Sequence, residues 1–350
     1  MMAMPQTQHS AEASTLFAAT ASLLRSAAAP KTMSGYQGHW LLFRAFCAHF
    51  NFEALPAEPR VVAAFLTYRT EVAVAKNLSY AVVKSASAAI HTAHELAGFS
   101  ESDSPTKHPL VKRLRRAAKK RIGIRAVHRK DPIDQTLLLQ AVQLYIPHSG
   151  TPDCRRLVAT MVAVAFSGFL RYADFSAIFA DQVTFFESHM EIFLDSRKND
   201  QFRQGHVIPI ARGHTDACPV HLTEEWIRIR GLAGKHLPLF PAWDNRQSAA
   251  RGSSPALHSI EFQANRPIPY HLARSEILSL IAKVLGCSFD DIRTRFGAHS
   301  LRSGGATAAA TRVEERLFQR QGGWRSQSAM YNYIEDPLEQ RLLVTQALGL

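Results

Sequence analysis

The chain has 350 residues, and 46% of them are hydrophobic, so it is long and apolar enough for two globular domains that each bury a core. No apolar run approaches the roughly 20 residues of a membrane-spanning helix, so we expect none. The four cysteines lie far apart without paired metal-ligand spacing, which argues against a disulfide scaffold and indicates a reducing compartment.

The first hundred residues predict a tail followed by helices. Residues 1–30 are rich in Ala, Ser and Thr and lack the charged and apolar regions of a secretory signal, so we expect a mobile tail. From residue 36 to residue 98, apolar side chains recur at helical spacing and strand alternation is absent. Pro56, Pro59 and Gly98 separate the segments. We therefore expect a compact helical domain over residues 31–125.

The positive charge is concentrated at the end of this domain. The chain has 41 Lys and Arg against 29 Asp and Glu, a net charge of +12. Eleven of these cations and no acid lie between Lys107 and Lys130, which leaves 30 basic against 29 acidic residues elsewhere. Such a basic helix, or helix plus linker, can follow a phosphate backbone. The candidate DNA contacts are Lys112, Arg113, Arg115, Arg116, Lys119, Lys120 and Arg121. A solvated linker or a nuclear-import signal would have the same composition.

The second domain, residues 126–350, is predicted to mix helices with a small antiparallel sheet. Asp131 and Pro132 suit the N-cap and first position of a helix, and residues 157–169 form an apolar run typical of a buried helix. The periodicity then changes, and residues 182–186, 190–195 and 206–210 predict three short strands. Helices resume at Pro219, residues 238–267 include a stretch typical of a loop, and residues 274–285 and 298–310 predict two more helices. The fold class is therefore mostly α with a small antiparallel β-sheet.

A last helix is predicted near the C-terminus. Asp336, Pro337 and Glu339 suit its N-cap, first and third positions. Leu338, Leu342 and Leu348 give it an apolar stripe. The pattern allows this stripe to pack on its own domain or on another surface.

Four residues near the C-terminus suit attack on a phosphodiester by a tyrosine. His299 and Arg302 lie three residues apart, on one face of the predicted helix, so both can reach one phosphate. Trp324 has an indole N–H that only donates, and Tyr333 follows it by nine residues. Tyrosine has a pKa near ~10, so it needs cationic and N–H groups that stabilise the charge of the transition state. Tyr331 is a rival nucleophile, but it lies about 200° away around a helix.

Upstream residues complete an ordered set. Arg171 and Asp174 occur in the phrase Leu-Arg-Tyr-Ala-Asp, and Lys198 lies in Asp-Ser-Arg-Lys-Asn-Asp at the end of a predicted strand. With His299, Arg302, Trp324 and Tyr333, this set resembles the tyrosine recombinase (phage integrase) family. Gly322-Gly323-Trp324 and Asn332-Tyr333-Ile334 are similar to its Cre-like branch. The motifs extend from residue 131 to the C-terminus.

The resemblance implies a helical core-binding domain that clamps DNA, followed by an α+β catalytic domain that needs no cofactor or metal. Tyr333 would form a 3′-phosphotyrosyl link and release a 5′-hydroxyl, while Arg171 and Arg302 hold the phosphate oxygens. Lys198 would protonate the leaving oxygen. His299 would assist proton transfer or hydrogen-bond the phosphate.

The two remaining side chains would support this chemistry: Trp324 would donate its N–H and pack the site, and Asp174 would orient a neighbouring basic group.

The same resemblance implies a site-specific recombinase of double-stranded DNA with paired half-sites. It would act as a dimer on each site and a tetramer in the synapse, where the terminal helix docks on a neighbour. Residues 302–306 are similar to recombinases of eukaryotic mobile elements, which favours transposition over integration or excision. The chain would work in the cytoplasm or nucleoid of a prokaryote, or in a nucleus.

Two other functions stay open. A type IB topoisomerase uses a similar residue set to nick and reseal one duplex, without assembly on two sites. A catalytically silent DNA-binding protein could descend from a recombinase, although drift would then be expected to remove a member of the set.

Overall fold

The computed structural model describes two compact units, residues Met1–Val127 and His128–Leu350. The described residues are 12–16, 18–20, 23, 30–123, 129–145, 153–197, 200, 204–244, 261–310, 312–335 and 338–348. Most of the predicted tail, Lys198, Asp336 and Pro337 lie outside them. None of the helices within these ranges is long and apolar enough to cross a membrane.

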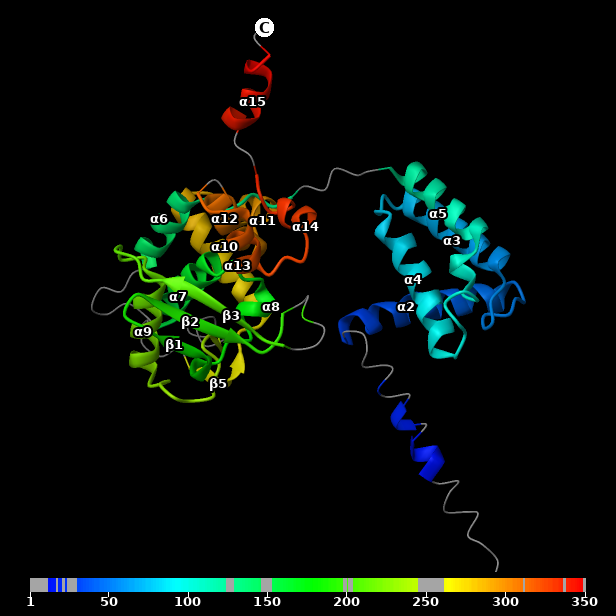
Figure 1. Ribbon diagram of the computed structural model, residues 1–350, viewed down its shortest axis with the longest axis horizontal. Helices are drawn as coiled ribbons and strands as arrows, with labels where there is room; N and C mark the ends of the chain where they lie inside the picture. Colours follow the sequence, from blue (N-terminus) through cyan, green and yellow to red (C-terminus); the bar gives the residue numbers. More distant parts are fainter. Residues whose placement is uncertain are drawn as a thin grey trace, which may run out of the picture. The chain divides into compact units, whose positions relative to one another are not determined.

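The first unit is helical (Figure 1), as predicted. Its helices are α2 (Pro30–His49), α3 (Pro59–Ala75), α4 (Ala81–Leu96) and α5 (Pro109–Ile122), with the short 3-10 helix η1 (Pro105–Lys107) before α5. Phe43, Phe65 and Ile90 from α2, α3 and α4 are buried in one core. Their helical spacing in the sequence is what allows three helices to share that core.

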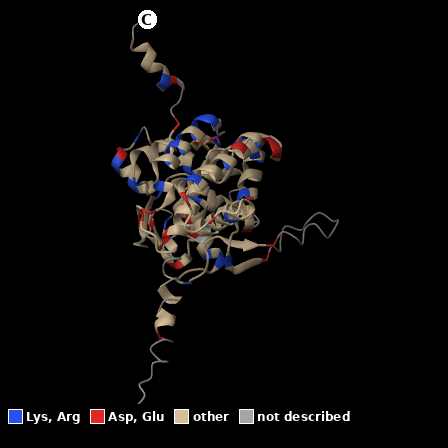
Figure 2. Cartoon of the chain, turned by 90° about the vertical axis from the view of Figure 1, so that its right-hand side faces the viewer, with Lys and Arg blue, Asp and Glu red and all other residues tan. Residues whose placement is uncertain are grey.

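The helix α5 joins this core through one narrow stripe. Val111, Ala118 and Ile122 are buried, and their spacing of seven and four residues places them on one face of a helix. Six of its basic residues, Lys112, Arg113, Arg116, Lys119, Lys120 and Arg121, are exposed. Figure 2 shows the Lys and Arg residues of the chain in blue. The segment is therefore a helix up to Ile122, with the charge turned toward solvent.

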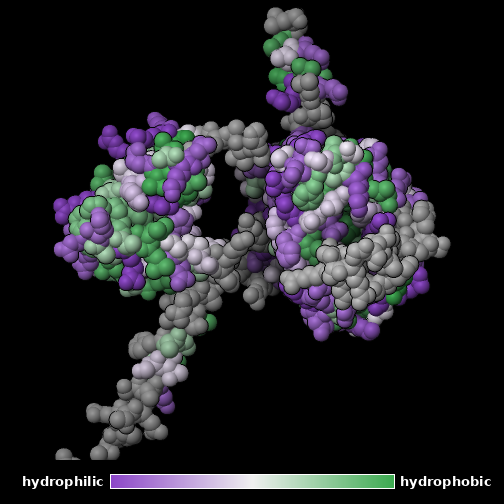
Figure 3. All heavy atoms as spheres, turned by 180° about the vertical axis from the view of Figure 1, so that it is seen from behind, coloured by the Kyte–Doolittle hydropathy of each residue, from purple (hydrophilic) through white to green (hydrophobic). Residues whose placement is uncertain are grey.

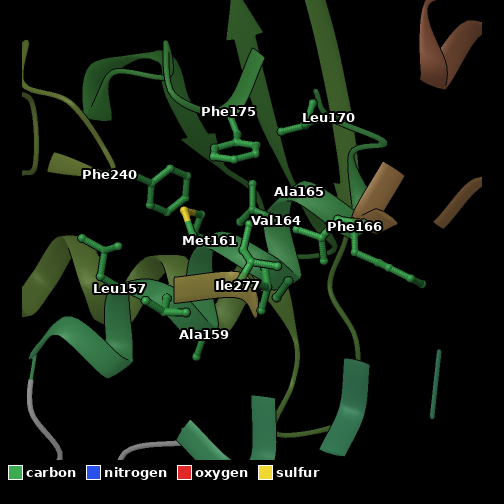
Figure 4. Close-up of a cluster of buried hydrophobic side chains, with 14 of the residues drawn as sticks. Leu157, Ala159, Met161, Val164, Ala165, Phe166, Leu170, Phe175, Phe240 and Ile277 are labelled. Carbon is green, nitrogen blue, oxygen red and sulfur yellow. The ribbon is translucent and has the colours of Figure 1, made fainter. Parts of the chain in front are cut away.

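The second unit contains most of the remaining helices. They are α6 (Gln135–Tyr145), α7 (Asp153–Ser167), α8 (Tyr172–Phe175), α9 (Pro219–Arg230), α10 (Tyr270–Leu285), α11 (Phe289–Arg295), α12 (His299–Ala310), α13 (Glu315–Gly322), α14 (Gln327–Tyr331) and α15 (Leu338–Gln346), with the 3-10 helix η2 (Ala180–Gln182). The apolar run that begins at Leu157 lies in α7, which is buried from Leu157 to Phe166. In Figure 4, Met161 and Val164 of α7 gather with Phe175, Phe240 and Ile277 from three other parts of the unit.

The unit also contains the predicted antiparallel sheet, which confirms the fold class. The strands β1 (Val183–Phe185), β2 (His189–Leu194) and β3 (His206–Ala211) pair in the order β1-β2-β3. Met190, Ile192 and Leu194 are buried on one face of β2, as the alternation predicts. The register sets Ile192 opposite Val183 and Ile208.

Two details differ from the prediction. The region expected to include a loop contains a second, two-stranded sheet of β4 (Pro241–Trp243) and β5 (Phe262–Pro267), which pairs two segments far apart in the chain. The prediction that a helix starts at Asp131 and Pro132 was wrong, because Asp134 Oδ1 accepts from Leu137 N at 2.7 Å and caps α6 at Gln135. Asp131 instead bonds Arg295, through N–H to O at 2.7 Å.

Candidate active site

The helix α12 carries His299 and Arg302 and lies unusually close to its neighbours. A Cβ atom on Gly304 would lie 1.8 Å from the carbonyl oxygen of Ile133, and one on Gly305 would lie 2.2 Å from that of Phe166. Only glycine permits this approach to two backbones. Because α12 lies so close to these backbones, the side chain of Arg302 is fully buried. These two glycines are positioning residues that the sequence analysis did not single out for packing.

Two carbonyl groups and two rings hold the Arg302 guanidinium. Nη1 donates to Phe169 O, and Nη2 donates to Gly322 O at 2.8 Å. The guanidinium carbon lies 4.3 Å from the Trp324 ring centroid and 4.8 Å from that of Tyr333. Arg302 Nε has no hydrogen-bond partner among the described residues. The guanidinium is therefore held through Nη1 and Nη2, and its Nε–H group has no partner among the described residues.

Arg171 and Asp174 lie at the start of α8, beside this guanidinium. Phe169 adopts a positive φ of 49°, which ends α7 and turns the chain toward α8. Asp174 Oδ2 accepts from Arg171 N at 3.0 Å and lies 3.8 Å from Arg171 Nη1. The carboxylate is buried, whereas the Arg171 side chain keeps 13% of its surface exposed. Arg171 can therefore reach a ligand while Asp174 holds its backbone.

The structure adds a third arginine, Arg197, that the sequence analysis missed. It follows β2 and is 7% exposed. Its Nη2 lies 3.5 Å from Asp174 Oδ2, and its Nη1 donates to Gln321 O at 3.2 Å. In the sequence it is one cation in a polar turn, and only its position next to Lys198 pointed to it. Lys198 itself lies outside the described residues.

Tyr333 meets His299 across the site. The Tyr333 hydroxyl lies 3.1 Å from His299 Nε2, and the two rings are 5.1 Å apart. Trp324 packs on Tyr333 with a centroid distance of 5.3 Å. Its indole is 5% exposed and its Nε1 has no partner among the described residues. The hydroxyl, the imidazole and an unused indole N–H therefore share one site.

Tyr331 points elsewhere. It is 54% exposed, and its hydroxyl donates to Glu315 Oε1 at 2.9 Å, which raises the pKa of Tyr331. A raised pKa makes a phenol harder to ionise. The rival tyrosine is therefore tied to the outer side of α13.

The site is positively charged and short of acceptors. Three guanidiniums (+3) and the Asp174 carboxylate (−1) leave a net charge of +2. Burial, and then the charge of Arg171, lower the pKa of Arg302 to about 9. Burial also lowers the pKa of Arg197, against the effect of Asp174.

Its buried donors without a partner among the described residues are Arg171 Nη1, Arg197 Nε, Arg302 Nε and Trp324 Nε1. Each unmet donor costs about 1–3 kcal/mol, so a bound anion would stabilise the whole set.

The structure thus brings together six of the seven predicted catalytic residues. They are Arg171, Asp174, His299, Arg302, Trp324 and Tyr333. The predicted DNA-contact residues all lie on α5, in the other unit. Within the described ranges, no group of three His, Cys, Asp or Glu side chains is placed to hold a metal ion.

Comparison with known proteins finds similarity in structure only. No family model and no curated protein matches this sequence. A lambda integrase dimer bound to a COC′ core site is 15% identical with a TM-score of 0.54, over 89% of this chain and 90% of that one.

Two further solved structures match about as well. The XerH recombinase, in a post-cleavage complex with palindromic difH, is 14% identical with a TM-score of 0.53, over 88% and 76% of the two chains. A lambda integrase tetramer bound to a Holliday junction is 14% identical with a TM-score of 0.53, over 88% and 73%.

Proposed function

We propose that this chain, which has the fold of the tyrosine recombinases, is a site-specific DNA recombinase that uses Tyr333 as its nucleophile. The observation that carries the proposal is the Tyr333 hydroxyl, 3.1 Å from His299 Nε2 and beside buried guanidiniums with unused N–H groups. Such a hydroxyl has a proton acceptor on one side and an anion site on the other. The further similarity to the Cre-like branch stays a prediction.

In the proposed reaction, the Tyr333 oxygen attacks the phosphorus and the bond to the 5′-oxygen breaks. His299 Nε2 takes the phenolic proton, and the leaving oxygen receives a proton, which we assign to Lys198. The product is a 3′-phosphotyrosyl link and a 5′-hydroxyl. Attack by the 5′-hydroxyl of a partner strand reverses these bonds and releases Tyr333, so no external energy source is needed.

The positive groups stabilise charge on the non-bridging oxygens. Arg171 and Arg302 stay charged, Arg302 keeps its Nε–H group unused, and Trp324 adds one further donor. Removing one such donor from a preorganised site typically costs about 10²–10³ in rate. Asp174 keeps Arg171 in place through its backbone N–H.

We extend the proposal to assembly on paired half-sites, because the similar proteins are a dimer on a core site and a tetramer on a Holliday junction. The helix α15 supplies an apolar surface for such contacts. Leu342, Leu343 and Val344 of this helix are 43%, 59% and 69% exposed, Leu348 just after it is 65% exposed, and hydrophobic spheres are visible on the helix in Figure 3. The role of the recombination would be integration, excision or transposition of a mobile element.

Covalent trapping on a library of nicked suicide duplexes tests this proposal. The wild type should form adducts that survive denaturant, Tyr333→Phe should form none, and the matched Tyr331→Phe should keep them. Sequencing the trapped DNA identifies the target.

The other outcomes separate the alternatives. Loss of the adduct only with Tyr331→Phe would reject the assignment of the nucleophile. DNA binding without any adduct would favour a silent binding protein. Adducts that reseal but never exchange strands between duplexes would favour a topoisomerase.

A further inference from the structure

A second basic site lies beside the catalytic residues. A cavity of about 490 Å³ is walled by Trp324 and by five basic side chains, namely Arg197, His206, Arg316, Arg320 and Arg325. The proposed chemistry assigns no step to these five, although Arg197 also contributes its charge to the tyrosine site. Their convergence from the segment after β2, from β3 and from the segment around α13 is visible only in the folded chain.

The charge of this cavity is not balanced. Among the lining residues that the structure describes, four guanidiniums (+4) face one carboxylate, that of Asp200 (−1), which leaves +3. Asp200 already accepts from Gln204 N and Gly205 N, each at 3.1 Å. Arg316, Arg320 and Arg325 form no ion pair within the described part of the chain. Burial and the charge of Arg197 lower the pKa of His206, which also indicates a cationic environment.

Arg197 forms the buried base of the cavity. It is 7% exposed, and its Nε has no partner among the described residues. Gly323, with φ of +62°, leaves room for the Arg197 guanidinium at the floor of the cavity, since a Cβ atom there would lie 2.7 Å from Arg197 Nη1. A buried cation with an unused donor and rim arginines above it is suited to the oxygens of a phosphate.

The cavity shares two walls with the tyrosine site. Trp324 lines it and also stacks on Arg302 at 4.3 Å, and Arg197 lines it and also lies 3.5 Å from Asp174. The cavity therefore adjoins the position proposed for the scissile phosphate.

We propose that the cavity binds a second phosphate of the same DNA strand, next to the scissile one. The proposal rests on the proposed function and adds a contact that fixes the strand. Two phosphates held at once restrict both position and rotation, so the scissile phosphorus is held in line with Tyr333. A free phosphate ion or a nucleotide shares this chemistry, and the experiment separates these sources.

The test uses Arg316→Ala/Arg320→Ala in a Tyr333→Phe background, so that binding is measured without cleavage. Duplexes of the trapped target carry one neutral methylphosphonate at each position near the cleavage site. With Arg316 and Arg320 present, neutralising one flanking phosphate should weaken binding by about tenfold, the low end expected for a charged hydrogen bond. In the double variant that loss should disappear at the same position, because the two changes remove one interaction.

Arg266→Ala is the matched control, because Arg266 is an exposed arginine of β5 that bonds Gln263. It should keep the full methylphosphonate effect. Equal losses in both variants at every position would overturn the proposal. So would binding of inorganic phosphate that needs Arg316 and Arg320 while no flanking phosphate of DNA matters. Unchanged circular dichroism and melting temperature exclude misfolding of the variants.

The proposed function can fail separately. If the wild type traps no duplex, recombination is rejected, and a random-sequence duplex tests the cavity alone. The slope of log affinity against log salt should then be smaller by about 0.9 in Arg316→Ala/Arg320→Ala than in Arg266→Ala, since the one phosphate contact proposed for the cavity contributes about 0.9. Equal salt slopes in the two variants would show that the cavity does not contact DNA.

Discussion

The carboxylate of Asp174 serves three groups at once. Its Oδ2 accepts from Arg171 N at 3.0 Å and lies 3.8 Å from the guanidinium of Arg171 and 3.5 Å from that of Arg197. All of this occurs in a buried site with a positive excess. Asp174 therefore limits the repulsion between two arginines and also fixes the start of α8.

The variant Asp174→Asn should lose stability, because the amide keeps an acceptor but leaves the buried Arg197 and the partly exposed Arg171 without a counter-charge. We expect a loss of about 3 kcal/mol in the free energy of unfolding, measured in urea. Asp181→Asn is the control, since Asp181 pairs with the exposed His236 and should cost less than about 1 kcal/mol. Equal effects of the two substitutions would contradict the role assigned to Asp174.

A second buried polar residue, His94, should make the first unit sensitive to acid. Its Nε2 accepts from Ala57 N at 3.0 Å and its Nδ1 bonds Ile90 O at 2.7 Å, an arrangement that requires the neutral ring. Burial lowers the pKa of His94 below the usual 6.5 of histidine, while the bond to Ile90 opposes this shift and the charge of His91 adds to it. Because the unfolded chain then binds the proton more readily, stability falls as the pH drops below about 6.5.

Urea unfolding of the first unit between pH 7.5 and pH 5 checks this expectation. The fluorescence of Trp40, whose ring lies 6.5 Å from that of His94, reports on the unit. The variant His94→Gln should start less stable but lose less stability on acidification. The control His49→Gln, at an exposed histidine, should keep the pH dependence of stability seen in the wild type. A wild-type stability that does not change with pH would contradict a neutral His94 ring.

At the scale of elements, the position of α12 depends on backbone contact. Ile133 N donates to Ser300 O at 3.0 Å, and Gly304 lets the same segment lie against the helix. This contact sets how deep Arg302 lies. A glycine pair that lowers helix propensity is therefore retained next to two catalytic candidates.

The variant Gly304→Ala should destabilise the second unit by about 1–3 kcal/mol or more, because the new methyl group would overlap the Ile133 carbonyl. Thermal unfolding measures the loss. Gly297→Ala is the control, since its added atom would meet only Lys130 Cγ at 3.9 Å. If Gly304→Ala were as stable as the control, the close approach of α12 would be disproved.

The helix α5 makes a separate prediction about DNA affinity. Lys112, Arg116 and Lys119 are exposed, whereas Arg121 pairs with Glu71 at 2.8 Å. Replacing the first three by Ala should reduce the salt slope of duplex binding by about 0.9 each. Arg60→Ala, which removes an exposed arginine paired with Glu58, should leave the slope unchanged. If the salt slope of duplex binding were unchanged in the triple variant, the proposed contact between α5 and DNA would be rejected.

At the scale of the whole molecule, two features bear on the proposed assembly on DNA: the exposed apolar surface of α15 and the basic residues of the two units. The described apolar side chains of α15 are exposed, so this helix contributes little to the stability of its own chain. Six to ten neutralised phosphates would lower affinity by roughly 10³ to 10⁵ between about 50 and 200 mM salt. Contacts from both units would add to such a number, because α5 and the tyrosine site belong to different units.

Removing residues 338–350 should leave the melting temperature of the free chain nearly unchanged but reduce its multimers on paired target sites. Light scattering of the protein and its DNA complexes measures both. Leu342→Asp should reproduce the loss of multimers, and Gln346→Asp, a polar position on the same helix, should not. A large fall in melting temperature would show that α15 packs on its own unit instead.

Local pattern determined much of this protein. The helices of the first unit, the buried run in α7 and the three strands follow from the spacing of apolar residues, since period and burial are properties of neighbours in the chain. The order of Arg171, Asp174, His299, Arg302, Trp324 and Tyr333 was also legible, through their resemblance to a family. The fold class was therefore predicted, and it is confirmed.

Only the tertiary structure decided the rest, because it depends on contacts between distant segments. Asp134 caps α6 in place of Asp131, which bonds Arg295 instead. The strands β4 and β5 pair across the intervening chain. Arg197 becomes a site residue only because folding brings Asp174 and Gln321 to it, and the second basic cavity exists only where α13 meets the segment after β2. A charge in a sequence is assumed to face water, and only the fold can bury it beside other charges.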